Sequence, residues 1–312
     1  MSAALFRTLL GTLVLLVLTA GPVLASGVDV EGGHVRWDEG LETLGRQAAA
    51  AVPRVRAEVA RRLGWPYAGP DVEVVIVRGR DRMQVEARAQ VPEWAVGAAI
   101  SARALILIRS DLLHRGFGGG VVPVLRHEWV HLAWGQHAGA SRRTLPLWAE
   151  EGLAEEIGGG VSIDLGATLD LAVVFHRLLD FKDLETSFPR SAAKAALAYR
   201  QSESWIGYVA EHVGWPPLQQ VLIELADGKA AGDALPDESA FQRAVRVHTG
   251  RSVGEWQAAW RVSLEEQATP WFHLVLRDFQ GSILAGLALL GAVAFFFLVR
   301  RRRRQIARLP DS

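Results

Sequence analysis

The segment His127-Glu128-Trp129-Val130-His131 combines residue types and spacing that suit a metal site. In a helix, positions i and i+4 lie on one face about one turn apart, so both imidazoles can bind the same zinc ion. The glutamate between them can then reach a water molecule on that ion. The H-E-x-x-H pattern therefore indicates a zinc site on a helix, with Glu128 as candidate general base.

A catalytic zinc ion needs a third protein ligand and one open position. His137 stands six residues after His131, which is the spacing of the pattern H-E-x-x-H-x-x-G-x-x-H. That pattern also requires a glycine at position 134 and a methionine turn downstream. Position 134 is tryptophan, and the only methionines are Met1 and Met83. We therefore favour a loop role for His137 over a ligand role.

The other candidate, Glu151, follows the second histidine by 20 residues, enough for one loop and a return helix packed against the first. On that helix Glu151 and Glu155 are at i and i+4, so a ligating and a supporting carboxylate can lie on one face. Glu150 points about 100° away from Glu151, which makes Glu151 the better ligand. The small residues Gly152 and Ala154 would let the two metal-bearing helices approach closely, and they equally fit an ordinary core helix.

These two motifs together resemble a known family. HEWVH followed by LPLWAEEGLAE is similar to the gluzincin metallopeptidases, in particular to exported or membrane-associated bacterial proteins with a peptidase-MA-like domain. The pattern of that group is H-E-x-x-H followed by W-x-x-E-G-x-A, and the resemblance covers roughly residues 70–265. It implies a zincin-like, thermolysin-like domain that binds one zinc ion. The residues it implies are His127, His131 and Glu151 as ligands, Glu128 as general base and Glu155 as support for the first ligand.

The activity implied by the resemblance is hydrolysis of a peptide bond. Zinc lowers the pKa of a bound water to about 7 and polarises the scissile carbonyl, while Glu128 moves the water's proton to the leaving amine. In this family the strand before the H-E-x-x-H helix, here 104–109, commonly forms the edge on which an extended substrate pairs. Similar enzymes also place a tyrosine or histidine after the metal helices to stabilise the oxyanion, and Tyr199 fits that position. A core ring with a satisfied hydroxyl is an equal interpretation of Tyr199.

The elements that must position these residues follow from the hydrophobic pattern. Val72–Val77 and 104–108 are short apolar runs that predict buried strands, and 116–120 is a glycine-rich loop. The segment VVPVLRHEWVHLAW predicts a helix that tolerates Pro123 in its first turn, and a second helix begins after Pro146. Further helices are expected at 41–63, interrupted by Pro53, and at 193–213, 217–226, 238–248 and 253–266. A small sheet followed by helices predicts an α+β architecture.

The two ends of the chain have the pattern of an exported, membrane-anchored protein. Residues 1–25 combine a short basic start, an apolar run and a small residue before the cleavage point, which indicates a signal peptide or, if it is not cleaved, a signal anchor. Residues 282–299 form an uncharged stretch of 18 residues, about 27 Å long as a helix. The arginine-rich tail at 300–312 follows at once, so we expect a single transmembrane helix with this tail in the cytoplasm. The exported part then divides into a strand and helix segment at 26–70 and the peptidase domain at 71–275.

Composition and charge narrow the classes of function. The 312 residues include no cysteine, which excludes cysteine-based metal sites, nucleophiles and disulfides, and half of them are hydrophobic, enough for a core. Arg7 and the tail together carry a charge of +6, so residues 28–281 have a net charge of −6. A nucleic-acid partner is therefore not expected. The expected partners are a peptide or protein substrate and the membrane.

Three interpretations of function stay open. The favoured one is a zinc-dependent peptidase. A membrane-tethered scaffold or binding protein could keep the fold without turnover, although Glu128, the residue that such a protein would lose first, is present. A zinc hydrolase acting on an unusual amide, such as a cell-wall crosslink, would use the same ligands. An intramembrane protease is disfavoured, because Arg126 precedes the motif and no apolar stretch of about 20 residues surrounds it.

Overall fold

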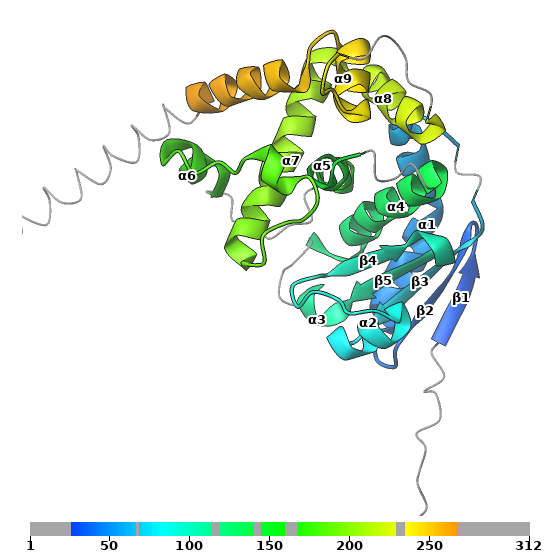
Figure 1. Ribbon diagram of the computed structural model, residues 1–312. Helices are drawn as coiled ribbons and strands as arrows, with labels where there is room; N and C mark the ends of the chain where they lie inside the picture. Colours follow the sequence, from blue (N-terminus) through cyan, green and yellow to red (C-terminus); the bar gives the residue numbers. More distant parts are fainter. Residues whose placement is uncertain are drawn as a thin grey trace, which may run out of the picture.

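The computed structural model describes residues 26–66, 69–113, 119–139, 145–159, 168–228 and 235–267. The N-terminal half is built around a mixed five-stranded sheet (Figure 1). Its strands are β1 (Ser26–Val30), β2 (Gly33–Trp37), β3 (Val72–Val77), β4 (Gly97–Ile100) and β5 (Leu105–Arg109). Their order is β1-β2-β3-β5-β4, with β2, β3 and β5 parallel and the outer strands antiparallel to their neighbours. This is the small mixed sheet expected for the α+β architecture.

Helices cover both faces of the sheet. The helices of this half are α1 (Glu42–Leu63), α2 (Arg80–Ala87), α3 (Ser110–Leu113) and α4 (Val121–Ala138). Because alternate side chains of a strand point to opposite faces, Ile106 and Ile108 of β5 join the large core with α1 and α4. Leu105 and Leu107 join a smaller core under α2. A strand buried on both faces has a continuous apolar sequence, which is why β3 and β5 were predictable.

The edge strand next to α4 is β4, so the expectation that 104–109 forms the edge is wrong. β5 lies between β3 and β4 and pairs with both. The chain forms β4, turns through the 3₁₀ helix η1 (Ser101–Arg103) and Ala104, whose φ is 47°, and returns antiparallel as β5. The sequence Gly-Ala-Ala-Ile of β4 is too short and too poor in β-branched residues to predict a strand.

Helix α1 is continuous through Pro53, where an interruption was expected. A proline inside a helix removes one backbone donor and strains the preceding turn. The helix also buries Ala48, Val52, Val55 and Val59 against the sheet, each at 0% exposure. Packing of this apolar stripe outweighs the local loss of one hydrogen bond.

The C-terminal half consists of helices. They are α5 (Leu147–Gly158), α6 (Thr168–Val174), the 3₁₀ helix η4 (Phe181–Leu184), α7 (Ala192–Val213), α8 (Trp215–Asp227), α9 (Ala240–Thr249) and a helix at 253–267. Helix α5 packs between α4 and α7 (Figure 1). A Cβ atom at Gly152 would lie 2.6 Å from the carbonyl oxygen of Ser202 on α7. This glycine therefore permits close approach of α5 to α7, and not of the two metal-bearing helices as expected.

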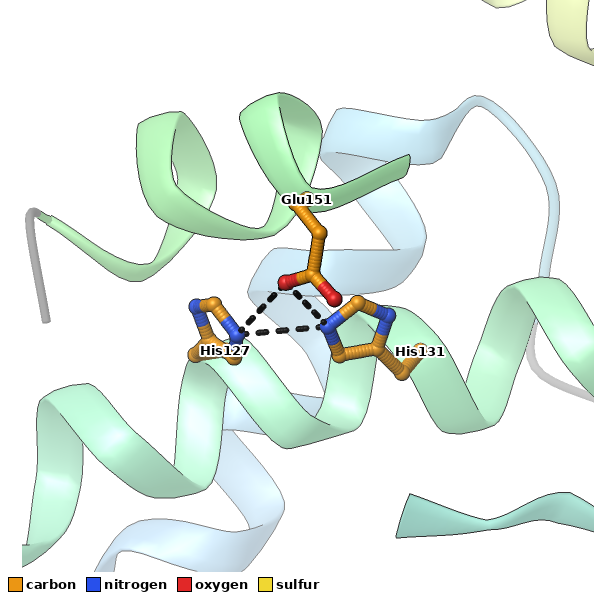
Figure 2. Close-up of side chains that lie close together, drawn as sticks. All are labelled: His127, His131 and Glu151. Atoms are coloured by element: carbon orange, nitrogen blue, oxygen red, sulfur yellow. Dashed lines mark hydrogen bonds and ion pairs between the residues drawn. The ribbon is translucent and has the colours of Figure 1, made fainter. Parts of the chain in front are cut away.

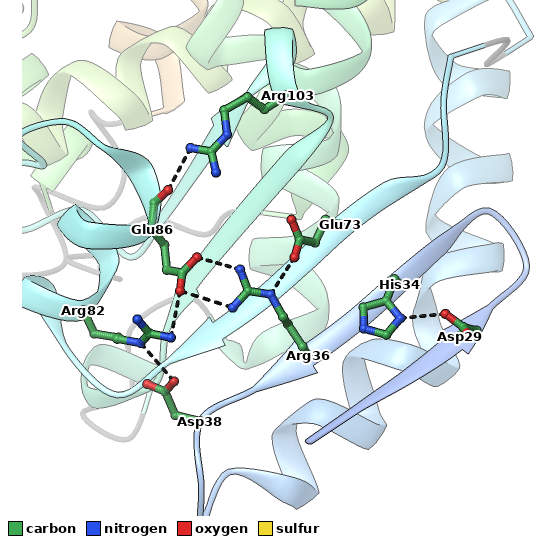
Figure 3. Close-up of polar contacts among 8 residues, drawn as sticks. All are labelled: Asp29, His34, Arg36, Asp38, Glu73, Arg82, Glu86 and Arg103. Atoms are coloured by element: carbon green, nitrogen blue, oxygen red, sulfur yellow. Dashed lines mark hydrogen bonds and ion pairs between the residues drawn. The ribbon is translucent and has the colours of Figure 1, made fainter. Parts of the chain in front are cut away.

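An ionic network fastens α2 to the sheet on the face opposite α4 (Figure 3). Arg36 of β2 contacts Glu86 of α2, with Nη2 2.6 Å from Oε2, and Glu73 of β3, with Nε 2.5 Å from Oε1. Arg82 adds a contact of 2.7 Å between its Nη2 and Oε1 of Glu86. The hydrogen bond from Arg36 holds the pKa of Glu86 below its ordinary value, although burial opposes it.

Replacing Glu86 by glutamine should lower the free energy of unfolding by about 1–3 kcal/mol, because two arginines lose a largely buried charged partner. Chemical denaturation at neutral pH measures the difference. Since the pKa of Glu86 is lowered on folding, its contribution is present above about pH 4 and is lost as the pH falls further. The control Asp29→Asn breaks an exposed ion pair, in which the side chain of Asp29 is 93% exposed and that of His34 is 47% exposed. It should hardly change the free energy of unfolding. Equal losses in both variants would contradict a stabilising network.

None of the helices in the described ranges is long and apolar enough to cross a membrane. The expected signal peptide at 1–25, the expected membrane span at 282–299 and the basic tail at 300–312 lie outside the described residues.

Candidate metal centre

Helix α4 carries the H-E-x-x-H segment into the interior. Gly120, with a φ of 112°, precedes the helix in a conformation that favours glycine, and Pro123 lies in the first turn as expected. His127, Glu128 and His131 are 7%, 7% and 8% exposed. The helix thus holds two imidazoles and a carboxylate in a site nearly closed to solvent.

Two imidazoles from α4 and one carboxylate from α5 converge on a single point (Figure 2). The Nε2 atoms of His127 and His131 are 3.2 Å apart. Oε2 of Glu151 lies 3.6 Å from the first and 3.3 Å from the second. Ligand atoms about 2.1 Å from a tetrahedral zinc ion lie about 3.4 Å from one another. The three separations match that geometry.

The chemistry of these three atoms also fits a metal ion. Oε2 of Glu151 is buried and has no hydrogen-bond partner among the described residues. Each of these three atoms carries a lone pair directed at the same point. Buried together, they need a shared cation between them, either protons or a metal ion. Two histidines and one glutamate are a known ligand set of catalytic zinc. The cluster therefore could hold one zinc ion, as expected from the sequence.

Burial and neighbouring charges shift the pKa of the three cluster residues and of Glu128. Burial alone would lower the pKa of both histidines, but neighbouring carboxylates outweigh it, and the pKa of His131 lies well above its ordinary value. Burial would raise the pKa of Glu151, but the two histidines pull it far below its usual range. For Glu128, burial prevails over the attraction of the histidines and raises the pKa.

Glu128 is pressed against the start of β4. A Cβ atom at Gly97 would lie 2.4 Å from Oε1 of Glu128. The carboxylate therefore occupies the space that a side chain at position 97 would fill, between the metal cluster and the edge of the sheet. Glu128 does not belong to the cluster of possible ligands.

Two further glutamates of α5 lie near the outer nitrogens of the histidines. Oε1 of Glu155 lies 3.5 Å from Nδ1 of His127, in line with the supporting position expected for it. Oε1 of Glu150 lies 2.9 Å from Nδ1 of His131. Only the contact of His131 is a hydrogen bond, because Nδ1 of His127 has no hydrogen-bond partner among the described residues. With its Nδ1–H directed at Glu150, the imidazole of His131 keeps the lone pair of Nε2 for a metal.

Sequence reasoning missed the contact of Glu150. It set Glu150 aside because this residue points about 100° away from Glu151. The two ring nitrogens of an imidazole lie on different sides, however, so a partner of Nδ1 must come from a different direction than a ligand beside Nε2. The signal available in the sequence was a second acidic residue next to Glu151 in an otherwise apolar helix segment. The structure buries this residue, since Glu150 is only 6% exposed.

Replacing Glu150 by alanine should weaken zinc binding by about tenfold to a hundredfold, because His131 loses the carboxylate that orients it. Competition with a chromogenic chelator measures the affinity. Glu150→Gln keeps an acceptor without the charge and should give a smaller loss. Glu156→Ala is the matched control on the same helix, since Glu156 faces Gly207 of α7. Unchanged affinity in Glu150→Ala would contradict this role.

Tyr199 of α7 lies at the border of the cluster. Its ring meets Trp94 with centroids 6.0 Å apart and Phe188 with centroids 4.8 Å apart. Burial raises its pKa well above the ordinary value, and the nearby carboxylates of the metal cluster raise it further. The hydroxyl therefore keeps its proton at neutral pH and can donate a hydrogen bond.

The histidine set aside as a ligand lies outside the cluster. His137 is in the last turn of α4, and not in a loop as expected. Its ring stacks on Trp65, with centroids 4.4 Å apart and an interplanar angle of 12°. Packing against an aromatic ring, and not metal binding, accounts for its position.

Comparison with known proteins gives a family match. The model of the Peptidase MA superfamily matches residues 56–252, more than half of the chain, and this range includes the whole cluster. No curated protein matches the chain.

Solved structures show a weaker likeness. The chain is similar to an M1 zinc metallopeptidase from Deinococcus radiodurans at 17% identity, with a TM-score of 0.37 over 77% of this chain and 50% of that one. It is also similar to a mutant M1 zinc metallopeptidase from the same organism bound to a Tyr-Ser-Ala substrate, at 17% identity, with a TM-score of 0.33 over 77% and 51% of the two chains. The chain thus spans about half the length of these structures.

Proposed function

The chain belongs to the Peptidase MA superfamily, and on that basis we propose that it is a zinc-dependent peptidase that hydrolyses peptide bonds. The observation that carries the proposal is the convergence of Nε2 of His127, Nε2 of His131 and Oε2 of Glu151, all within 4.8 Å of one another. Beside this cluster stands a buried carboxylate, Glu128, that is not a ligand candidate. Three ligands and a separate carboxylate are what metal-assisted hydrolysis requires.

In the proposed mechanism, His127, His131 and Glu151 hold the zinc ion. When bound, zinc acts as a Lewis acid that lowers the pKa of water to about 7 and polarises the scissile carbonyl. Glu128 accepts the proton of the attacking water at Oε1 and passes it to the leaving amine. Burial supports this role, because Glu128 is only 7% exposed and its carboxylate is held beside the cluster, away from bulk water. Glu150 and Glu155 keep the imidazoles oriented.

Tyr199 is the proposed donor to the carbonyl oxygen as negative charge develops on it. Its raised pKa supports this role, because the hydroxyl is neutral and retains a proton to donate. The aromatic contacts to Trp94 and Phe188 hold the ring at the border of the cluster.

The substrate is proposed to bind as an extended peptide along β4. In the described sheet, β4 pairs with β5 on one side only, and an unpaired strand edge can accept a further strand through main-chain hydrogen bonds. The strand begins at Gly97, directly beside Glu128. The backbone of a peptide paired with β4 would therefore run next to Glu128.

The proposed location is the outer side of a cell membrane. The support is the sequence pattern alone: an N-terminal export signal at 1–25 and an uncharged span at 282–299 followed by arginines. In this arrangement the peptidase domain lies outside the cytoplasm and the tail at 300–312 inside it.

The test compares the full-length protein in detergent with its Glu128→Gln variant. Zinc content is measured by mass spectrometry, and hydrolysis of a mixed peptide library by product analysis. Both proteins should bind one zinc ion per chain, and the variant should lose activity by about 10²- to 10⁴-fold. Bound zinc with no hydrolysis by either protein would contradict the peptidase and favour a catalytically silent scaffold or binding protein.

A further inference from the structure

A turn before β4 places a partly exposed tryptophan, Trp94, against Tyr199. Trp94 meets the ring of Tyr199 edge-on, at an interplanar angle of 74°, and Phe188 meets the same ring at 72°. We call Trp94, Phe188 and Tyr199 the aromatic wall. Three separate segments contribute to it: the turn before β4, the segment between η4 and α7, and α7 itself.

Arg109 holds this turn in place from the end of β5. Its Nη1 donates to the carbonyl oxygens of Glu93 at 2.8 Å and of Ala95 at 3.1 Å, the two neighbours of Trp94. The guanidinium also pairs with Asp111, at 2.8 Å between Nη2 and Oδ2. Arg109 is only 4% exposed. A buried planar donor that binds two carbonyls of one turn restrains the backbone on both sides of Trp94.

The same segment leads directly to the proposed catalytic base. Gly97, three residues after Trp94, begins β4 and lies against Glu128. Three residues of chain span at most about 10 Å, and the turn at Trp94 shortens this distance. A peptide paired with β4 and cleaved beside Glu128 therefore has a side chain opposite the aromatic wall within about three residues of the scissile bond.

We infer that the aromatic wall binds an aromatic or large aliphatic side chain of the substrate, close to the scissile bond. Rigid, partly exposed rings offer a large apolar surface at little cost in conformational entropy. The buried carboxylates of the neighbouring cluster disfavour an acidic side chain at the same place. This inference rests on the proposed function, and it names the substrate class as extended peptides with an apolar residue beside the cleaved bond.

The test measures peptide binding without turnover. The full-length, zinc-loaded Glu128→Gln protein in detergent is titrated calorimetrically with blocked octapeptides of Gly, Ser and Ala that carry Phe, Ala or Glu at one scanned position. The best Phe peptide should bind about tenfold more tightly than its Ala counterpart, and the Glu peptide should bind least. Adding Trp94→Ala should reduce the ratio of Phe to Ala affinity to about one, and Trp94→Phe should leave an intermediate ratio. Trp215→Ala, which removes a tryptophan that contacts Arg62 on α1, is the control and should keep the full ratio.

Equal affinity for the Phe and Ala peptides, binding of none of them, or a preference that survives both Trp94 variants would overturn the inference. Trp94→Phe keeps the test valid if Trp94→Ala fails to fold. Absence of hydrolysis by the wild-type protein counts against the proposed peptidase, whereas the binding ratio tests the aromatic wall by itself.

Discussion

Removing zinc from the full-length protein should lower its melting temperature, and the loss should grow as the pH rises from about 6 to about 9. The reason is the charge of the site. Glu128, Glu150, Glu151 and Glu155 surround two imidazoles. Three of these four carboxylates are at most 7% exposed, and the side chain of Glu151 is 15% exposed. Without a metal ion, only protons can offset these charges.

The sign of the pH dependence follows from the shifted pKa values. His127 and His131 have a raised pKa in the folded, metal-free protein, so their protonated forms stabilise it fully below about pH 6.5 and this stabilisation is lost as the pH rises through the folded values. The raised pKa of Glu128 acts in the same direction. Glu151, whose pKa is lowered, contributes above about pH 4 and loses its contribution in stronger acid.

Zinc replaces those protons, so its stabilising effect increases with pH. At a thousandfold excess over its dissociation constant, zinc should add about 4 kcal/mol. Thermal unfolding with zinc and with a chelator, measured across this pH range, gives the difference in melting temperature. A gap that shrinks as the pH rises would contradict the site, and the absence of any gap would show that no metal stabilises the fold.

Replacing Gly97 by alanine should reduce kcat/KM for a cleaved peptide by about 100-fold while zinc stays bound, because displacement of a catalytic group by about 1 Å has an effect of this size. The added Cβ atom would lie 2.4 Å from Oε1 of Glu128 and 2.6 Å from its Cγ. These atoms belong to a side chain and not to the backbone, so the fold should tolerate the change, whereas the side chain of Glu128 must shift from Cγ outward and its carboxylate is displaced.

Ala98→Ser is the matched control for this variant. It also adds one heavy atom to β4, but Ala98 packs on the smaller core under α2, on the face away from α4. Its activity should remain near that of the wild type. Wild-type activity in Gly97→Ala would show that the base does not work from the observed position, and a loss of zinc in this variant would indicate wider disruption.

Local spacing made the metal cluster predictable from the sequence. His127 and His131 are one helical turn apart, and Glu151 and Glu155 repeat that spacing on the next helix. The helices at 193–213 and 238–248 were also predictable within a few residues of α7 and α9, because their apolar residues recur with the helical period.

Features that depend on tertiary packing were not predictable. The contact of Glu150 with His131 depends on how α5 lies across α4. The edge position of β4 depends on sheet order, which its small residues do not reveal. The continuity of α1 through Pro53 is a case where burial of an apolar stripe overrides a local signal.

X-ray absorption at the zinc edge of the full-length protein tests the central claim most directly. We expect one zinc ion per chain with four nitrogen or oxygen ligands at about 2.0–2.1 Å, including the outer-shell scattering of two imidazoles from His127 and His131. Glu151→Ala should remove or rearrange this environment, and His137→Ala should leave it unchanged. A spectrum with three imidazoles, a wild-type spectrum in Glu151→Ala, or a protein that does not retain zinc would contradict the assignment.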